Sequence, residues 1–178
     1  MLCMPNYRRL FVPGGTWFFT VNLLERQGND LLLQEIATLR QVVRRVKARY
    51  PFEINAWVVL PEHLHAVLTL PPGDSDFSLR WRLIKSGFSR ALAKKEFISS
   101  IRQAAGERGI WQRHYWEHCI RDVVDYQRHV DYVHVNPLKH GWVERVCDWP
   151  YSTFHREVAA GIYPIDWCGD SSIIVGGE

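Results

Sequence analysis

Residues 53–70 read EINAWVVLPEHLHAVLTL, two apolar runs on either side of a Pro61-Glu62 pair. β-Branched and aliphatic residues dominate both runs, and a proline beside a polar residue is typical of a turn, so the stretch predicts two antiparallel strands. Successive side chains of a strand point to opposite faces. His63 and His65 are therefore expected to project from the same face of the second strand.

The segments around this hairpin predict the rest of the fold. Apolar positions recur every three or four residues in some segments, as in amphipathic helices, and aromatic or β-branched runs indicate strands elsewhere. The expected strands are residues 16–24, 53–60, 63–70 and 110–120, and the expected helices are residues 32–50, 77–92 and 122–136. This order predicts an α+β fold, a ferredoxin-like antiparallel sheet with helices packed mainly on one face.

Length and composition favour one globular domain over residues 1–168, with an irregular aromatic C-terminal extension and a flexible tail at 169–178. The chain has 178 residues, of which 47% are hydrophobic. Its apolar runs are too short to span a bilayer and its start does not resemble a signal peptide, which predicts a cytoplasmic protein without a membrane partner. Four scattered cysteines without C-x-x-C spacing are expected to be free thiols.

Basic residues are clustered more than the formal net charge of +3 suggests. They gather in residues 40–49, in residues 80–95 and in Tyr7-Arg8-Arg9, often beside an aromatic residue, a combination that suits phosphate contacts next to stacking surfaces. Solvated helix faces explain each cluster equally well.

His63 and His65, in the expected strand 63–70, offer ring nitrogens that converge on one point. Such a pair suits a divalent cation with one further protein ligand, although half-buried histidines without a metal are also common. Glu62 is a candidate additional ligand, but its place in a turn makes simple exposure the plainer expectation.

The expected helix 122–136 carries two distinct faces. An apolar stripe is expected from Val123, Tyr126, Val130 and Val133. Asp125, His129, Tyr132 and Asn136 step by four, three and four along another face. A phenol with an ordinary pKa near 10 is a poor nucleophile unless a cation or base assists it, and the Asn136 carboxamide suits magnesium or manganese. The alternative is a tyrosine that only packs.

A set of motifs spread over nearly the whole chain resembles one known family. The matching segments are Tyr7-Arg8-Arg9, residues 14–22 (GGTWFFTVN), residues 60–65 (LPEHLH), Trp111-Gln112-Arg113, Trp116-Glu117-His118, residues 131–141 (DYVHVNPLKHG) and residues 148–152 (DWPYS). The chain resembles the REP-associated tyrosine transposases, single-tyrosine members of the HUH endonuclease superfamily. Similar insertion-sequence transposases carry glutamine at the position of Asn136.

The resemblance implies a site and a reaction. His63, His65 and Asn136 would bind Mg²⁺ or Mn²⁺, and Tyr132 would attack a phosphodiester of single-stranded DNA beside an imperfect palindromic, REP-like hairpin. A 5′-phosphotyrosine and a free 3′-hydroxyl would result. The resemblance also implies a monomer, with a dimer as the alternative.

The residues alone leave two other functions open. One is a domesticated hairpin-binding protein without catalytic turnover, and the other is a small-molecule metal hydrolase. Basic side chains expected to contact DNA, each of which could instead be solvated, are Arg8, Arg9, Arg82, Lys85 and Arg113.

Overall fold

The computed structural model describes residues 11–169 and contains one four-stranded antiparallel sheet. Its strand order is β2-β3-β1-β4, so the first and third strands of the chain lie in the centre. The strands are β1 (Thr16–Asn22), β2 (Glu53–Val59), β3 (His63–Thr69) and β4 (Trp116–Cys119). The predicted α+β fold with an antiparallel ferredoxin-like sheet is confirmed.

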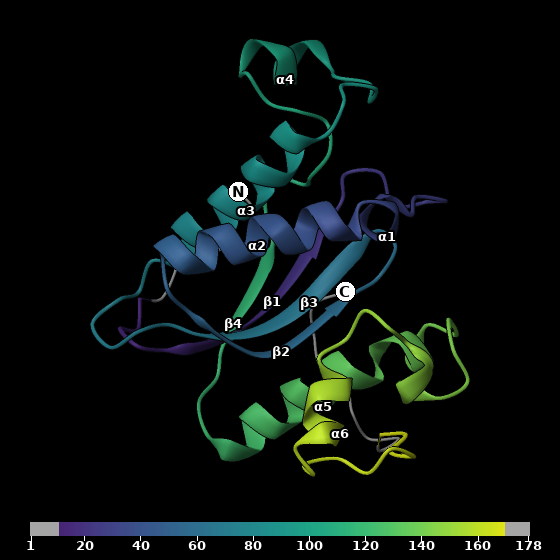
Figure 1. Ribbon diagram of the computed structural model, residues 1–178. Coiled ribbons are helices and arrows are strands. Elements are labelled where there is room, and N and C mark those ends of the chain that lie inside the picture. The colour runs from purple at the N-terminus through teal and green to yellow at the C-terminus, as the bar shows by residue number, and fades with distance from the viewer. Residues whose placement is uncertain (1–10, 170–178) are drawn as a thin grey trace, which may run out of the picture.

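Helices lie on both faces of this sheet, not mainly on one face as predicted (Figure 1). The helices α2 (Ile36–Arg49) and α3 (Phe77–Ala91) cover one face, and α5 (Val123–Lys139) and α6 (Phe154–Ala159) lie on the other. Three short elements connect them: α1 (Leu31–Gln34), α4 (Ser100–Ala104) and the 3₁₀ helix η1 (Val146–Asp148). No helix within residues 11–169 is long and apolar enough to cross a membrane.

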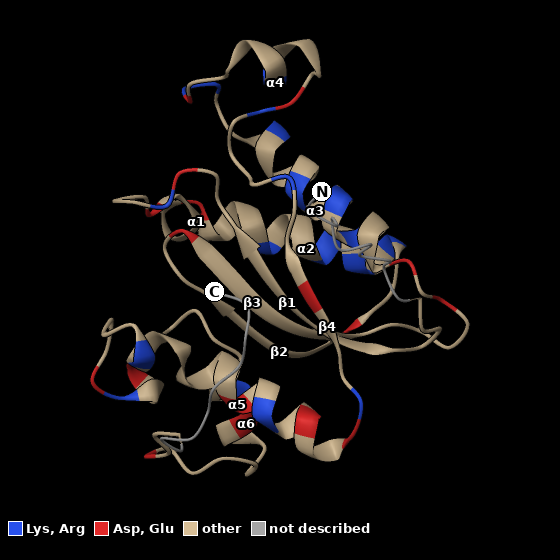
Figure 2. Ribbon diagram, turned by 180° about the vertical axis from the view of Figure 1, so that it is seen from behind, with Lys and Arg blue, Asp and Glu red and all other residues tan. Residues whose placement is uncertain are grey.

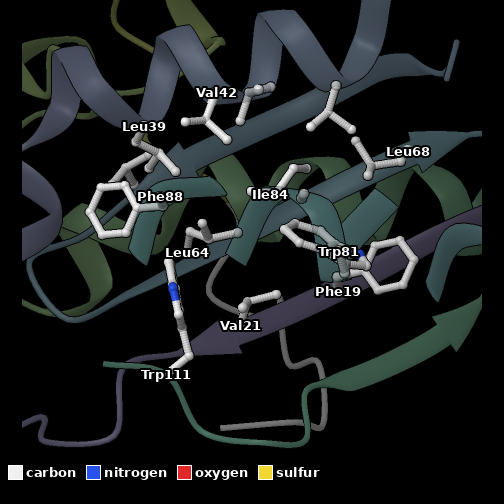
Figure 3. Close-up of a cluster of buried hydrophobic side chains, with 14 of the residues drawn as sticks. Phe19, Val21, Leu39, Val42, Leu64, Leu68, Trp81, Ile84, Phe88 and Trp111 are labelled. Carbon is white, nitrogen blue, oxygen red and sulfur yellow. The ribbon is translucent and has the colours of Figure 1, made fainter. Parts of the chain in front are cut away.

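Each face of the sheet has its own apolar core. The core under α2 and α3 includes Phe19, Leu64 and Trp81, which interdigitate in Figure 3. A Cβ atom added to Gly87 would lie 2.9 Å from a Val42 methyl carbon, so glycine allows α2 and α3 to pack closely. The second core lies under α5 and α6.

The strand register confirms the predicted alternation of β3. His65 pairs with Thr20 of β1 and His63 pairs with Asn22. Thr20 in turn pairs with Trp116 of β4. Alternate residues of β3 share a face, and the Tyr132 ring of α5 lies 5.2 Å from that of His65, so both histidines project toward α5.

The fourth strand is shorter than the predicted 110–120. Trp111 forms only an isolated bridge with Leu23, and the regular ladder begins at Trp116. Lys85 Nζ donates to the carbonyl oxygens of Gln112 and Arg113, at 2.7 and 3.2 Å. Because these carbonyl oxygens accept hydrogen bonds from a side chain, the hydrogen-bond ladder between strands is interrupted at Gln112 and Arg113.

The predicted end of the third helix was also wrong. Pro137 lies inside α5, which continues to Lys139. A proline removes one N–H from the helical ladder, but the turn around it persists because the His140 N–H still donates to the Asn136 carbonyl oxygen at 3.0 Å. Gly141, with φ of +71°, then allows the chain to turn away.

The predicted apolar stripe of this helix is only partly correct. Val123 is 81% exposed, whereas the face expected to be polar is buried against the sheet.

Three other segments differ from prediction. The helix 32–50 is divided into α1 and α2 at Glu35, the connector 101–109 overlaps α4, and the C-terminal extension contains η1 and α6. Arg8, Arg9, Cys3 and residues 170–178 of the expected tail lie outside the described residues.

Candidate metal and nucleophile site

Two imidazoles on β3 form the floor of the site. His63 and His65 are 1% and 0% exposed, and their ring centroids are 4.9 Å apart. His63 Nδ1 donates to Glu62 Oε1 at 3.0 Å, and His65 Nδ1 is hydrogen-bonded to Thr20 Oγ1 at 2.9 Å. The Nε2 atom of each ring is buried without a hydrogen-bond partner among the described residues. Each ring therefore keeps one nitrogen lone pair available in the tautomer whose Nδ1 carries the proton.

The charges around these rings favour cation binding. Burial, reinforced by neighbouring His63, lowers the pKa of His65 well below its ordinary value, so the ring is neutral at pH 7, as a metal ligand must be. Burial opposes ionisation of Glu62, but its hydrogen bond with His63 lowers the pKa of that carboxyl to about 2. Glu62 also accepts from Arg26 at 3.3 Å. The expectation that Glu62 is simply exposed was wrong, because its carboxylate orients His63.

The Asn136 side chain is completely buried, and it has no polar partner in the part of the chain that the structure describes. Neither its Oδ1 nor its Nδ2 atom forms a hydrogen bond within residues 11–169. Tyr132 and His140 lie one turn before and one turn after Asn136 on the same face of α5. The Tyr132 ring lies 5.2 Å from that of His65, and the His140 ring lies 5.5 Å from that of His63. The carboxamide therefore faces the pair of imidazoles.

The Tyr132 side chain is buried beside the metal-binding candidates. Its ring lies edge-on to His65 and to Phe18, with centroid distances of 5.2 and 5.8 Å. Lys139 Nζ lies 4.9 Å from the Tyr132 ring centroid. The structure thus brings together the tyrosine and both predicted histidines, while their chemical roles stay predictions.

These residues fit a divalent cation. Leaving a buried polar group unpaired costs about 1–3 kcal/mol, and here two imidazoles and a carboxamide carry such groups side by side. Imidazole nitrogen suits first-row transition-metal ions, and amide carbonyl oxygen suits Mg²⁺ and Mn²⁺.

A second cluster of potential ligands lies between β4 and α5. The ligand atoms of His118, Asp125 and His129 are within 4.8 Å of one another. Here the atoms already have partners: His118 Nε2 and Arg121 Nε both donate to Asp125 Oδ2 at 2.9 Å. His129 Nδ1 donates to the Asp125 carbonyl oxygen at 2.7 Å.

This cluster therefore acts as a clamp that holds α5 on the edge strand. Burial opposes ionisation of Asp125, but Arg121 and His118 hold the pKa of its carboxyl well below the usual range. The sequence prediction placed Asp125 and His129 on the Tyr132 face, yet missed His118, because nothing local links β4 to the helix.

Three of the predicted DNA contacts lie away from this site: Arg82 and Lys85 on α3, whose Lys and Arg residues are blue in Figure 2, and Arg113 in the segment before β4. Arg82, Lys85 and Arg113 line a cavity of about 800 Å³ between α3 and residues 106–115. Arg113 Nε donates to Glu107 at 3.0 Å. The ammonium of Lys85 donates to backbone carbonyl oxygens, and burial lowers the pKa of Lys85 to about 8. Arg82 and Arg113 are exposed, whereas Lys85 is partly buried.

Known proteins resemble this chain along nearly its full length. It is 53% identical over 175 residues to the REP-associated tyrosine transposase of Escherichia coli strain K12, with 98% of each chain covered. A Haemophilus influenzae protein with the same family name is 44% identical over 176 residues, which are 98% of this chain and 99% of that one. No family model matches the chain.

A solved structure shows the same similarity in three dimensions. The structure of a REP-associated tyrosine transposase bound to a REP hairpin superposes with a TM-score of 0.83 at 52% identity, covering 98% of both chains. Identity of this extent, over whole chains, establishes kinship. The chain belongs to the family of REP-associated tyrosine transposases, which are DNA-processing enzymes.

Proposed function

We propose that this protein is a divalent-metal-dependent enzyme that cleaves and rejoins single-stranded DNA beside a REP-type hairpin. The observation that carries this proposal is that the Nε2 atoms of His63 and His65 and both side-chain amide atoms of Asn136 are buried without a hydrogen-bond partner within residues 11–169. These atoms lie beside Tyr132, whose ring is 5.2 Å from that of His65. Support for the hairpin comes from the 52% identical relative whose structure contains one.

In the proposed reaction the Tyr132 hydroxyl oxygen attacks the scissile phosphorus. A bond forms between that oxygen and phosphorus, and the bond from phosphorus to the 3′-oxygen breaks. The phenol releases its proton and the departing oxygen takes one up, so the products are a 5′-phosphotyrosine and a free 3′-hydroxyl. The phosphotyrosine ester retains the energy of the broken bond, which lets a 3′-hydroxyl reverse the step and join strands.

The chain's own residues prepare this site. His63, His65 and Asn136 would hold Mg²⁺ or Mn²⁺, which supplies neutralisation of charge on a phosphate oxygen when bound. Thr20 and Glu62 fix the orientation of the two imidazoles through their Nδ1 atoms.

Covalent capture tests the proposal. The protein is incubated with an oligonucleotide that carries a REP-type hairpin and a single-stranded flank, with and without Mn²⁺, and adducts are separated on denaturing gels. Wild type should form an adduct only with the metal. Tyr132→Phe should form none while it still binds the hairpin.

Tyr126→Phe is a matched control, because Tyr126 lies on the same helix and outside the site. It should form the adduct as wild type does. An adduct with Tyr132→Phe, or hairpin binding by wild type without any adduct in Mn²⁺, would contradict the proposed reaction.

A further inference from the structure

A groove on the β2 edge of the molecule is lined by positive charge and has no part in the site above. It has a volume of about 500 Å³ and lies between α2 and residues 151–153. Those residues cover the edge of the sheet: the Val59 N–H donates to the Tyr151 carbonyl oxygen at 2.9 Å, and Val58 pairs with Ser152. The groove is therefore a formed feature between two fixed walls.

The groove contains four cations and no carboxylate among the described residues. The lining includes Arg40, Arg44, Lys47 and Arg156, and none of the lining residues is Asp or Glu. Arg156 is held by the carbonyl oxygens of Ile54 and Asn55 and by Glu157. Within residues 11–169, the three groove cations on α2, namely Arg40, Arg44 and Lys47, form no ion pair with a carboxylate.

The three α2 cations repel one another at helical-neighbour spacing. Arg40 and Arg44 are four residues apart and Lys47 is three further on, and like charges at such spacings destabilise a helix. The helix has no acidic residue to offset this. A bound polyanion would remove the repulsion.

The dimensions of the charged wall suit a polymer of phosphates. From Arg40 to Lys47 the helix rises about 10 Å, at about 1.5 Å per residue. One DNA strand places a phosphate about every 3.4 Å along a duplex axis, so the wall spans about three phosphates. Trp57 and Tyr151 add aromatic surface to the groove, which favours nucleic acid over a small inorganic anion.

The groove shares a wall with the helix that carries the nucleophile. Thr153 lines the groove, and its Oγ1 atom is hydrogen-bonded to His134 Nε2 of α5 at 3.3 Å. Val59 also lines the groove and lies four residues before His63. DNA in the groove would therefore border the elements that build the catalytic face.

We propose that this groove binds the phosphodiester backbone of the DNA substrate through Arg40, Arg44 and Lys47. The inference rests on the proposed function for the identity of the substrate. The backbone belongs either to the hairpin stem or to its single-stranded flank, and the experiment below separates these two sources.

The test compares two double variants of α2 with equal loss of charge. Arg40→Gln/Arg44→Gln removes two groove cations, and Arg45→Gln/Arg49→Gln removes two cations that line a different hollow of the same helix. Glutamine keeps helix propensity close to that of arginine, so both variants should fold, as thermal melting would show. Binding is measured by fluorescence anisotropy in EDTA, over a series of salt concentrations.

Three DNA probes are used: a blunt hairpin, the same hairpin with a flank, and the flank alone. For the groove variant we expect binding at 0.1 M salt to be weaker by about 25-fold for single strands or about 60-fold for duplex. The salt slope should be smaller by about 1.4 for single strands or about 1.8 for duplex. If the groove variant binds the blunt hairpin more weakly than wild type does, the groove binds the stem. If it binds only the flanked hairpin and the flank alone more weakly, the groove binds the flank. The control variant should bind nearly as wild type does.

Two results would overturn the groove as a DNA site. One is wild-type affinity and salt slope of the groove variant for all three probes, and the other is an equal loss in the control variant. Adduct formation by the groove variant at saturating DNA should match wild type. If wild type forms no adduct, the proposed reaction is refuted. The anisotropy comparison of the two double variants still tests whether the groove binds DNA.

Discussion

Removing the Thr20 hydroxyl should weaken metal binding without touching any proposed ligand. The Oγ1 atom of Thr20 lies 2.9 Å from His65 Nδ1, and both side chains are buried. Thr20→Val keeps the shape and β-branching of the side chain but leaves Nδ1 unpaired. The ring then loses the contact that sets its tautomer and its orientation.

The size of this effect follows from the geometry. Loss of a hydrogen-bond partner behind a ligating histidine weakens metal binding by about 10- to 100-fold, which corresponds to about 1.4–2.8 kcal/mol. An unpaired buried nitrogen should also lower the free energy of unfolding by about 1–3 kcal/mol in the absence of metal. Both effects should appear in the same variant.

Calorimetric titration with Mn²⁺ measures the first effect and urea unfolding the second. Thr16→Val is the matched control, because Thr16 lies on the same face of β1 and its hydroxyl bonds Thr69 at 2.8 Å, away from the histidines. The control should bind Mn²⁺ as wild type does. If Thr20→Val is folded and binds Mn²⁺ within twofold of wild type, the idea that Thr20 orients His65 is refuted.

Three further predictions concern the Asp125 clamp, the Glu96–Arg108 ion pair and the packing of α2 on α3. Asp125→Asn should lower the free energy of unfolding by about 1–3 kcal/mol and slow adduct formation, as urea titration and gel assays would show. The hydrogen bond from Arg108 lowers the pKa of Glu96 to about 2. The stability contributed by ionised Glu96 is thus present above pH 4.5 and lost as pH falls toward 2. Between pH 6 and pH 3 the free energy of unfolding, measured with urea, should therefore fall by about 2 kcal/mol more for wild type than for Glu96→Gln. An equal fall in both proteins would contradict this. Gly87→Ala would place a carbon 2.9 Å from Val42 Cγ1 and should lower the free energy of unfolding by about 1–3 kcal/mol, whereas an unchanged urea midpoint would show that α2 and α3 separate easily.

The local parts of the site were predictable from sequence. Alternation along a strand depends only on neighbouring residues, so it placed His63 and His65 on one face before any packing was known. Helical phase did the same for Tyr132 and Asn136, four residues apart. The register of β3 and the buried face of α5 agree with both expectations.

Competition between local signals and tertiary contacts explains where the predictions failed. Pro137 is a helix terminator by its own chemistry, yet α5 passes through it in a turn that is buried against the sheet. The predicted strand 110–120 begins late because Lys85, a residue of α3, takes the carbonyl oxygens of Gln112 and Arg113. Neither outcome could be derived from the segment itself.

The sequence by itself determined the antiparallel hairpin, the direction of its two imidazoles and the pairing of tyrosine with asparagine, since each depends on a period within one element. Only the tertiary structure decided that α5 lies on the histidine face, opposite α2 and α3. That placement brings Tyr132 to 5.2 Å from His65 and leaves Asn136 buried without a partner among the described residues. The reason is physical: contacts between distant elements depend on chain crossovers and on packing of whole faces, which no local period encodes.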